Sequence, residues 1–472
     1  MSAHATGIEK GTEAVSPDKL TGLRFPNAAA PVPSQEKQSV NPTADPLRPA
    51  SVVSPEAGTS EDDDDEVDND EGYPEGGLKA WLVVLGSWLA LFSALGLMNT
   101  LATFQAYVST HQLQDHSEGQ IGWIFSVYTF LTFFCGIYIG PIFDKYGPKW
   151  LVLAGTILLV ASLILLSFST EYWHFLLSFG ILSGFASSLL FTPSIAAVGH
   201  FFKKRRGLAT GIASTGGSVG GVIFPLMLTN LFERIGWAWA VRVQALLSFT
   251  LCAASNFLIR SRLPPPKNAK VHPDFLIFRD VTMLLTTIGI FLLEFALFIP
   301  LTYITSYMLA SGFDETFAFN TLAIFNAASV LGRALPGYWG DKFGPFNSNM
   351  GATLLSIFGA LVVWLPFGKT TPGVIIFAIL IGFASGNNIS ISPVCIGRLC
   401  HTKHYGRYYA TSYTVVAVAC LVSIPIGGEI LAATGGNYWA LIVFTGLLYV
   451  ASFVVLLAAK ISYVGWKPLA IF

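Results

Sequence analysis

Charged residues are scarce in this sequence. Asp, Glu, Lys and Arg make up 12% of the 472 residues, whereas 53% are hydrophobic and the mean hydropathy is +0.59. Soluble domains carry about 25% charged residues, so the composition excludes a soluble protein. The formal net charge of -1 argues against nucleic acid as a partner, because binding to phosphates requires a basic excess.

Reactive and metal-binding side chains are also few. The five cysteines lie in apolar stretches or at their ends and suggest neither a disulfide framework nor a zinc site. The sequence contains no phosphate-binding loop, and no cluster of His, Cys, Ser or paired carboxylates falls within the apolar stretches. We therefore expect a protein that is not an enzyme and that needs no cofactor or metal.

Long apolar runs dominate the chain from Trp81 to Lys460. Each is roughly 20 residues long, which is the length of helix that crosses ~30 Å of hydrocarbon. Residues 1–78 differ, because they are rich in Pro, Ser and acidic residues, and we expect them to form a disordered cytoplasmic tail. The apolar runs predict twelve transmembrane helices, near 81–107, 121–143, 150–169, 174–199, 208–231, 238–259, 281–308, 319–339, 350–367, 373–397, 410–433 and 438–460.

The distribution of Lys and Arg orients these helices. The connections after the even-numbered spans hold fifteen of them, and the alternate connections hold only Arg234 and Lys369. Basic residues accumulate in cytoplasmic connections, so both termini and the central linker are expected in the cytoplasm. The basic run from Lys203 to Arg206 is interpreted as part of this topology signal and as a contact for lipid headgroups.

An internal repeat divides the membrane region. The segment 140–148 (GPIFDKYGP) recurs as 337–345 (GYWGDKFGP), 197 residues later. Two six-helix halves of the same orientation follow, with a solute site at their interface. We expect an all-α membrane protein with halves at 79–260 and 281–460, a cytoplasmic linker at 261–280 and a cytoplasmic C-terminal tail at 461–472.

The repeated segment resembles the signature of the major facilitator superfamily between helices two and three. Small residues let helices touch, and the aspartate can accept hydrogen bonds from the N-terminal amides of a neighbouring helix. Such a contact would latch the cytoplasmic gate. The candidate gating residues in the two copies are Gly140, Asp144, Lys145, Gly337, Asp341 and Lys342.

Two further segments are similar to the monocarboxylate transporters. Residues 75–81 (EGGLKAW) resemble the start of their helix one, and residues 201–213 (FFKKRRGLATGIA) resemble the start of their helix five. The acidic, Pro-rich tail is similar to that of the fungal branch. The resemblance implies a proton relay from which two charges are missing, because Asn99 and Ser329 stand where the family has a lysine and an aspartate. The helix-eight arginine is retained as Arg333.

Polar residues inside the predicted spans are candidates for binding the solute. A charge near the bilayer centre costs at least ~2.5 kcal/mol unless it faces a cavity or a partner. Arg333 and Glu294 are therefore either substrate-binding and proton-handling residues or the partners of a fixed ion pair. Pro393 is expected to interrupt helix ten near further amides, and interrupted helices often form transport sites. The candidate amides are Asn99, Asn326, Asn387 and Asn388, each of which could instead bond neighbouring helices.

Together these features predict a secondary transporter that moves a small organic solute across a membrane by alternating access. The solute is expected to be anionic, with or without a coupled proton. Two alternatives remain open at this point. The chain could export a secondary metabolite, or it could be a nutrient sensor that binds without transport. We expect a multi-pass protein of the plasma membrane, with the vacuolar or another internal membrane as the alternative.

The charge distribution gives a direct test of topology. Epitope tags at residue 40, within residues 263–275 and after Phe472 should all report the cytoplasm, and a tag between Ser109 and Ser117 should report the outside. Accessibility of each tag before and after membrane permeabilisation measures this. A cytoplasmic tag in the 109–117 connection would contradict the twelve-span arrangement.

Overall fold

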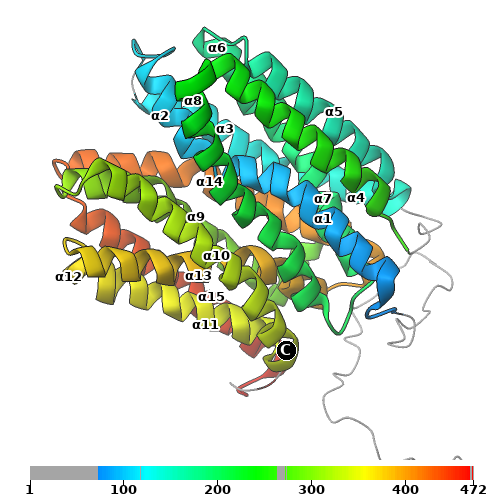
Figure 1. The fold of residues 1–472 in the computed structure, drawn as a ribbon. Coiled ribbons are helices and arrows are strands. Elements are labelled where there is room, and N and C mark those ends of the chain that lie inside the picture. The colour runs from blue at the N-terminus through cyan, green and yellow to red at the C-terminus, as the bar shows by residue number, and fades with distance from the viewer. Residues whose placement is uncertain (1–72, 117, 263–271, 273, 468–469, 471–472) are drawn as a thin grey trace, which may run out of the picture. The chain divides into compact units, whose positions relative to one another are not determined.

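The computed structural model describes residues 73–116, 118–262, 272, 274–467 and 470, all of which lie in one compact unit, Glu66–Phe472. The predicted tail up to residue 72 and much of the predicted linker lie outside these residues. In the part of the chain that the structure describes, the regular elements are all helices (Figure 1).

The helices up to residue 258 form one group, shown blue to green in Figure 1, and the later helices form a second. The first group comprises α1 (Gly77–Met98), α2 (Leu101–Thr110), α3 (Glu118–Phe134), α4 (Gly136–Tyr146), α5 (Lys149–Leu166), α6 (Tyr172–Phe175), the π-helix η2 (Leu176–Ser183), α7 (Gly184–Gly199) and α8 (Arg206–Leu258). The second comprises the 3₁₀ helices η3 (Phe275–Arg279) and η5 (Thr402–His404), the π-helix η4 (Phe358–Trp364), and α9 (Val281–Ala310), α10 (Glu315–Phe343), α11 (Pro345–Ile357), α12 (Leu365–Phe367), α13 (Thr371–Arg398), α14 (Tyr405–Ala433) and α15 (Trp439–Val464).

The helices account for twelve membrane crossings. Among the described residues, ten helical stretches are long and apolar enough to span a membrane. One of them, α8, is 53 residues long and has non-helical backbone at Gly236 (φ 73°, ψ 172°), so it contains two spans. The twelfth is α10, whose 29 residues suffice in length but include Asn326 and Arg333. The prediction of twelve transmembrane helices is therefore confirmed.

Two local details differ from the sequence-based expectation. The prediction that Pro393 interrupts its helix is wrong, because α13 continues through this proline to Arg398. A proline removes only one backbone donor, and the packed environment of this helix tolerates the loss. The first span is interrupted instead, at Asn99 and Thr100 between α1 and α2, where the Thr100 hydroxyl donates to the Gly96 carbonyl over 2.7 Å.

Glycines allow the closest helix contacts in the bundle. Between α10 and α13, a Cβ at Gly332 would overlap the carbonyl oxygen of Phe383, and one at Gly386 would overlap that of Ser329. Small residues bring helix backbones together in lipid, where dispersion contacts and hydrogen bonds drive association. These contacts fix α10, and with it Arg333, against α13.

The glycine contact predicts a difference between two alanine substitutions. Gly332→Ala should destabilise the protein by about 1–3 kcal/mol, because the new methyl group meets backbone that cannot rotate away. Gly351→Ala is the matched control, because Gly351 lies in helix α11 with nothing within 4 Å of its added Cβ. It should be neutral or stabilising by up to ~1 kcal/mol. Thermal unfolding of the purified protein measures both, and equal stability of the two variants would contradict the prediction.

Candidate functional site

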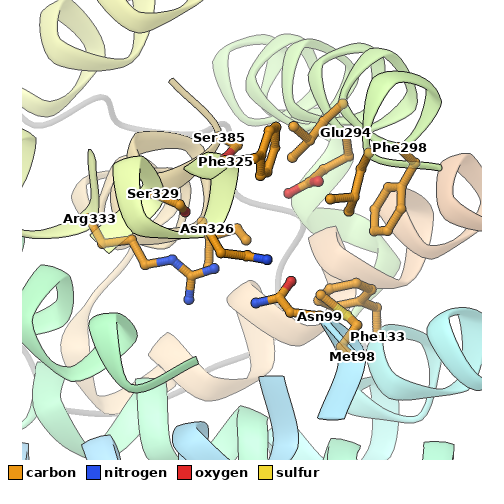
Figure 2. A pocket seen from close by; sticks show the side chains of 13 residues that line it. Met98, Asn99, Phe133, Glu294, Phe298, Phe325, Asn326, Ser329, Arg333 and Ser385 are labelled. Carbon is orange, nitrogen blue, oxygen red and sulfur yellow. The ribbon is translucent and has the colours of Figure 1, made fainter. Parts of the chain in front are cut away.

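A small cavity lies between the two groups of helices (Figure 2). Its lining residues come from α1, α3, α9, α10 and α13, and from the break that follows α1. The cavity volume is about 20 Å³, enough for roughly one water molecule. The lining includes Met98, Asn99, Phe133, Glu294, Leu297, Phe298, Leu301, Phe325, Asn326, Ser329, Arg333, Ser385 and Ile389.

Two opposite charges face this cavity. Arg333 on α10 and Glu294 on α9 are both 2% exposed. Figure 2 shows the guanidinium and the carboxylate pointing into the cavity from different sides, with Asn326 and Asn99 near the space between them. Among the described residues, no carboxylate lies within 4.0 Å of the Arg333 guanidinium. The fixed ion pair considered above is therefore absent from this conformation.

Arg333 is only partly satisfied by the protein. Its Nη1 atom donates to the Ser214 carbonyl of α8 over 2.6 Å, and its Nε atom has no hydrogen-bond partner among the described residues. Burial of an arginine costs free energy unless its donors are bonded. The remaining donor capacity makes Arg333 suited to bind an anion that enters the cavity.

Three polar residues at the cavity are bonded across the helix interfaces. The Asn99 amide donates to the Gly217 carbonyl over 3.0 Å, and the Asn326 amide to the Gly221 carbonyl over 3.4 Å. Ser329 accepts a hydrogen bond of 3.1 Å from Ser218. Asn99 and Ser329, the two positions singled out in the sequence as uncharged, thus line the same cavity as Arg333.

The two amides of α13 lie outside the cavity lining. The Asn387 side chain donates to Asn349 over 3.1 Å and accepts from Ser348 over 3.1 Å, so it links α13 to α11. Asn388 accepts from Ser392 over 2.6 Å, and its side chain also interacts with the Glu294 carboxylate. In this conformation Asn387 is separated from the other candidate residues, whereas Asn388 lies beside Glu294.

Two carboxylates connect the halves near the ends of α4 and α10. Asp144 accepts from the backbone amides of Gly406 and Arg407, over 3.1 and 2.8 Å, at the start of α14. Asp341 accepts from the amides of Gly207 and Leu208, both over 2.8 Å, at the start of α8. The amides of a first helical turn have no partner within their own helix and carry partial positive charge, so each carboxylate is well placed. We call these two contacts the latches.

The other signature residues divide between the latches and the surface. A Cβ at Gly140 would overlap the carbonyl oxygen of Gly406, and one at Gly337 would overlap that of Gly207, so both glycines permit the latch contacts. The two lysines lie over neighbouring rings instead. Lys145 is 5.4 Å from the ring centre of Tyr146, and Lys342 is 4.4 Å from that of Tyr338.

Arg206 is a residue whose position the sequence did not reveal. We expected it to contact lipid headgroups, yet it is 5% exposed. Its guanidinium donates to the Gly397 carbonyl and the Thr402 hydroxyl of the second half, each over 3.1 Å, and lies 4.9 Å from the ring centre of Tyr405. Arg206 therefore reinforces the latched side. Its place in a run of four basic residues hid this role, because only tertiary packing separates it from Lys203–Arg205.

The described residues contain no group of three or more His, Cys, Asp or Glu side chains that could hold a metal ion. The groups that could bind a solute line the cavity, where one cation and one acid lie among several amides and hydroxyls. The latches are separate contacts between the halves.

Comparison with known proteins agrees with this architecture. The chain is 35% identical to the riboflavin transporter MCH5 of Saccharomyces cerevisiae, with 86% of this chain and 83% of that protein covered. It is 35% identical to the fujikurins efflux protein of Gibberella fujikuroi, with 84% and 85% covered. The solved structure of the transporter FucP in the outward conformation has the same fold, with a TM-score of 0.64, 16% identity, and 80% of this chain and 98% of that chain covered. Residues 80–423 match the Major Facilitator Superfamily, and the chain belongs to this superfamily of transporters.

Proposed function

We propose that this chain is a monocarboxylate-transporter-like secondary transporter that moves a small organic anion by alternating access. The observation that carries the proposal is the buried Arg333 guanidinium, which lines a cavity between the halves. Among the residues that the structure describes, its Nε atom is unbonded and no carboxylate lies within 4.0 Å. A charged group in such a position is expensive unless it serves a solute or a relay. An anion would supply the partner that Arg333 lacks.

The latches support alternating access. Both hold the starts of α8 and α14 against the opposite half, which closes one side of the cavity. By the distribution of Lys and Arg, this side is the cytoplasmic one. The present cavity of about 20 Å³ has no room for an organic solute, so binding requires the halves to separate on the other side. Release to the cytoplasm then requires both latches to break.

Charge balance at the cavity supports coupling to a proton. Glu294 is the acid among the residues that line the cavity, and together with Arg333 it makes the site neutral. Binding of an anion to Arg333 would leave Glu294 as an uncompensated negative charge in a medium of low dielectric. Protonation of Glu294 removes this penalty, so we assign the coupled proton to its carboxyl group.

Export of a secondary metabolite is the second candidate. The name of the Gibberella fujikuroi relative supports it, as does the replacement of two cavity charges by Asn99 and Ser329, which suits a larger and less acidic solute. Either solute can be identified by comparing metabolites inside and outside cells with and without the protein. We also propose the plasma membrane as the location, with both termini in the cytoplasm.

The assignment of Arg333 predicts a graded loss of transport. Arg333→Lys should reduce anion flux about tenfold, and Arg333→Gln should reduce it further, because charge-assisted and often bidentate hydrogen bonds are lost in turn. Flux of the identified solute into vesicles that contain each variant measures the effect. Arg333→Gln combined with Glu294→Gln is the control for folding, since it removes both buried charges. Normal anion flux in the double variant would contradict the assignment.

The assignment of Glu294 predicts that coupling and transport can be separated. Glu294→Gln should abolish accumulation of the solute driven by a proton gradient but retain exchange of solute across the membrane, because the neutral amide mimics the protonated acid. Proteoliposomes loaded with unlabelled solute measure exchange, and an imposed pH gradient measures accumulation. Proton-driven accumulation at the original rate would show that another group carries the proton.

A further inference from the structure

The residues in front of α1 fold onto the loop that precedes α8. The Glu75 carboxylate accepts hydrogen bonds from the amides of Lys203 and Lys204, both over 2.7 Å, and from the amide of Arg205 over 3.0 Å. The Glu75 amide in turn donates to the Phe201 carbonyl over 3.2 Å. One acidic residue therefore binds the backbone of the loop at four points, directly before the turn that Asp341 engages.

The backbone of Glu75 is strained. Its φ of 49° lies in the left-handed region, and among the described residues it is the one residue other than glycine with a positive φ. Strained conformations persist only where surrounding contacts hold them. The four hydrogen bonds supply such contacts, so the conformation of this segment is fixed by its bonds to the loop.

The second half carries a related arrangement. Asp274 precedes α9 as Glu75 precedes α1, and it stands 199 residues later in the chain. It forms an ion pair of 3.5 Å with Arg407 at the start of α14. The backbone amides that the two latch acids bind are separated by the same interval, since Gly406 and Arg407 follow Gly207 and Leu208 by 199 residues.

Each latched helix start therefore meets two acids. The start of α8 is held by Glu75 of its own half, through the preceding loop, and by Asp341 of the opposite half. The start of α14 is held by Asp274 of its own half and by Asp144 of the opposite half. The hydrogen bonds of the latch acids must break when the halves separate, whereas the contacts that Glu75 and Asp274 make within their own halves can persist.

We propose that Glu75 and Asp274 are positioning residues for the gate, which hold the first turns of α8 and α14 in the orientation that the latch acids bind. A first helical turn that is already ordered loses less conformational entropy when the latch acid binds it. Without Glu75, the 203–205 loop can rotate the amides of Gly207 and Leu208 away from Asp341. This inference rests on the proposed alternating access, but not on the identity of the solute.

The test is a double-mutant cycle read by hydrogen–deuterium exchange of the full-length protein in lipid nanodiscs without solute. Glu75→Ala and Asp341→Asn should each raise exchange of the amides in 206–210 by about tenfold, the change expected for one lost charge-assisted hydrogen bond. The double variant should raise it no further than the stronger single variant, because both acids act on one turn. The effects of Glu75→Ala and Asp144→Asn on exchange should be independent and additive, because Asp144→Asn acts on the other latch.

The outcomes separate this inference from the proposed gate. No effect of Asp341→Asn would refute the latch itself. An effect of Asp341→Asn without one of Glu75→Ala, or effects of the two that multiply, would overturn the positioning role. Glu171→Ala is the matched control, because Glu171 caps α6 away from both latches and should leave exchange in 206–210 unchanged.

If Glu75→Ala does not fold, the second half supplies an independent cycle, because Asp274 makes a partly exposed ion pair whose loss the fold should tolerate. Asp274→Asn should raise exchange of the amides in 405–410. Combination with Asp144→Asn should raise this exchange no further, whereas the effects of Asp274→Asn and Asp341→Asn should be additive. Unchanged exchange in 405–410 would overturn the proposal for both halves.

Discussion

Two carboxylates bound to the first turns of helices in the opposite half hold the present conformation together. Asp144 and Asp341 together accept four backbone hydrogen bonds, and the partial positive charge of a helix start stabilises each of them. Because the donors are backbone amides, the contact needs the correct helix position and little else from the partner. The latches thus depend on geometry, and any segment that orients the receiving turn affects them directly.

The spacing within the repeated signature follows from this contact. Gly140 precedes Asp144 by four residues, and Gly337 precedes Asp341 by four, so each glycine lies one helical turn from its acid on the same face. The glycine allows the opposing backbone to approach, and the acid then reaches its first-turn amides. A side chain at the glycine would hold the helices apart and lengthen the hydrogen bonds of the acid.

The sequence predicted those features that depend on local pattern or on repetition. Apolar length gave the twelve spans, and the repeat located both latch acids together with the kind of partner that they bind. The sequence could not show which face of each helix lines the cavity. Asn326 and Asn387 look alike in the sequence, yet one lines the cavity and the other joins α13 to α11. Arg206 was misinterpreted for the same reason, since the packing of the second half against it leaves no trace in the neighbouring residues.

The cavity also bears on the two charges that, by the resemblance to the monocarboxylate transporters, the sequence is expected to lack. Removal of a lysine and an aspartate together leaves the net charge of the site unchanged, and Arg333 with Glu294 still makes it neutral. A neutral site that gains an anion must also gain a positive charge or pay the cost of an unpaired charge in low dielectric. Under the proposed function, proton coupling therefore does not require the family's relay, because it follows from the charge balance of two residues. The replaced positions, Asn99 and Ser329, are then free to shape the cavity for the solute.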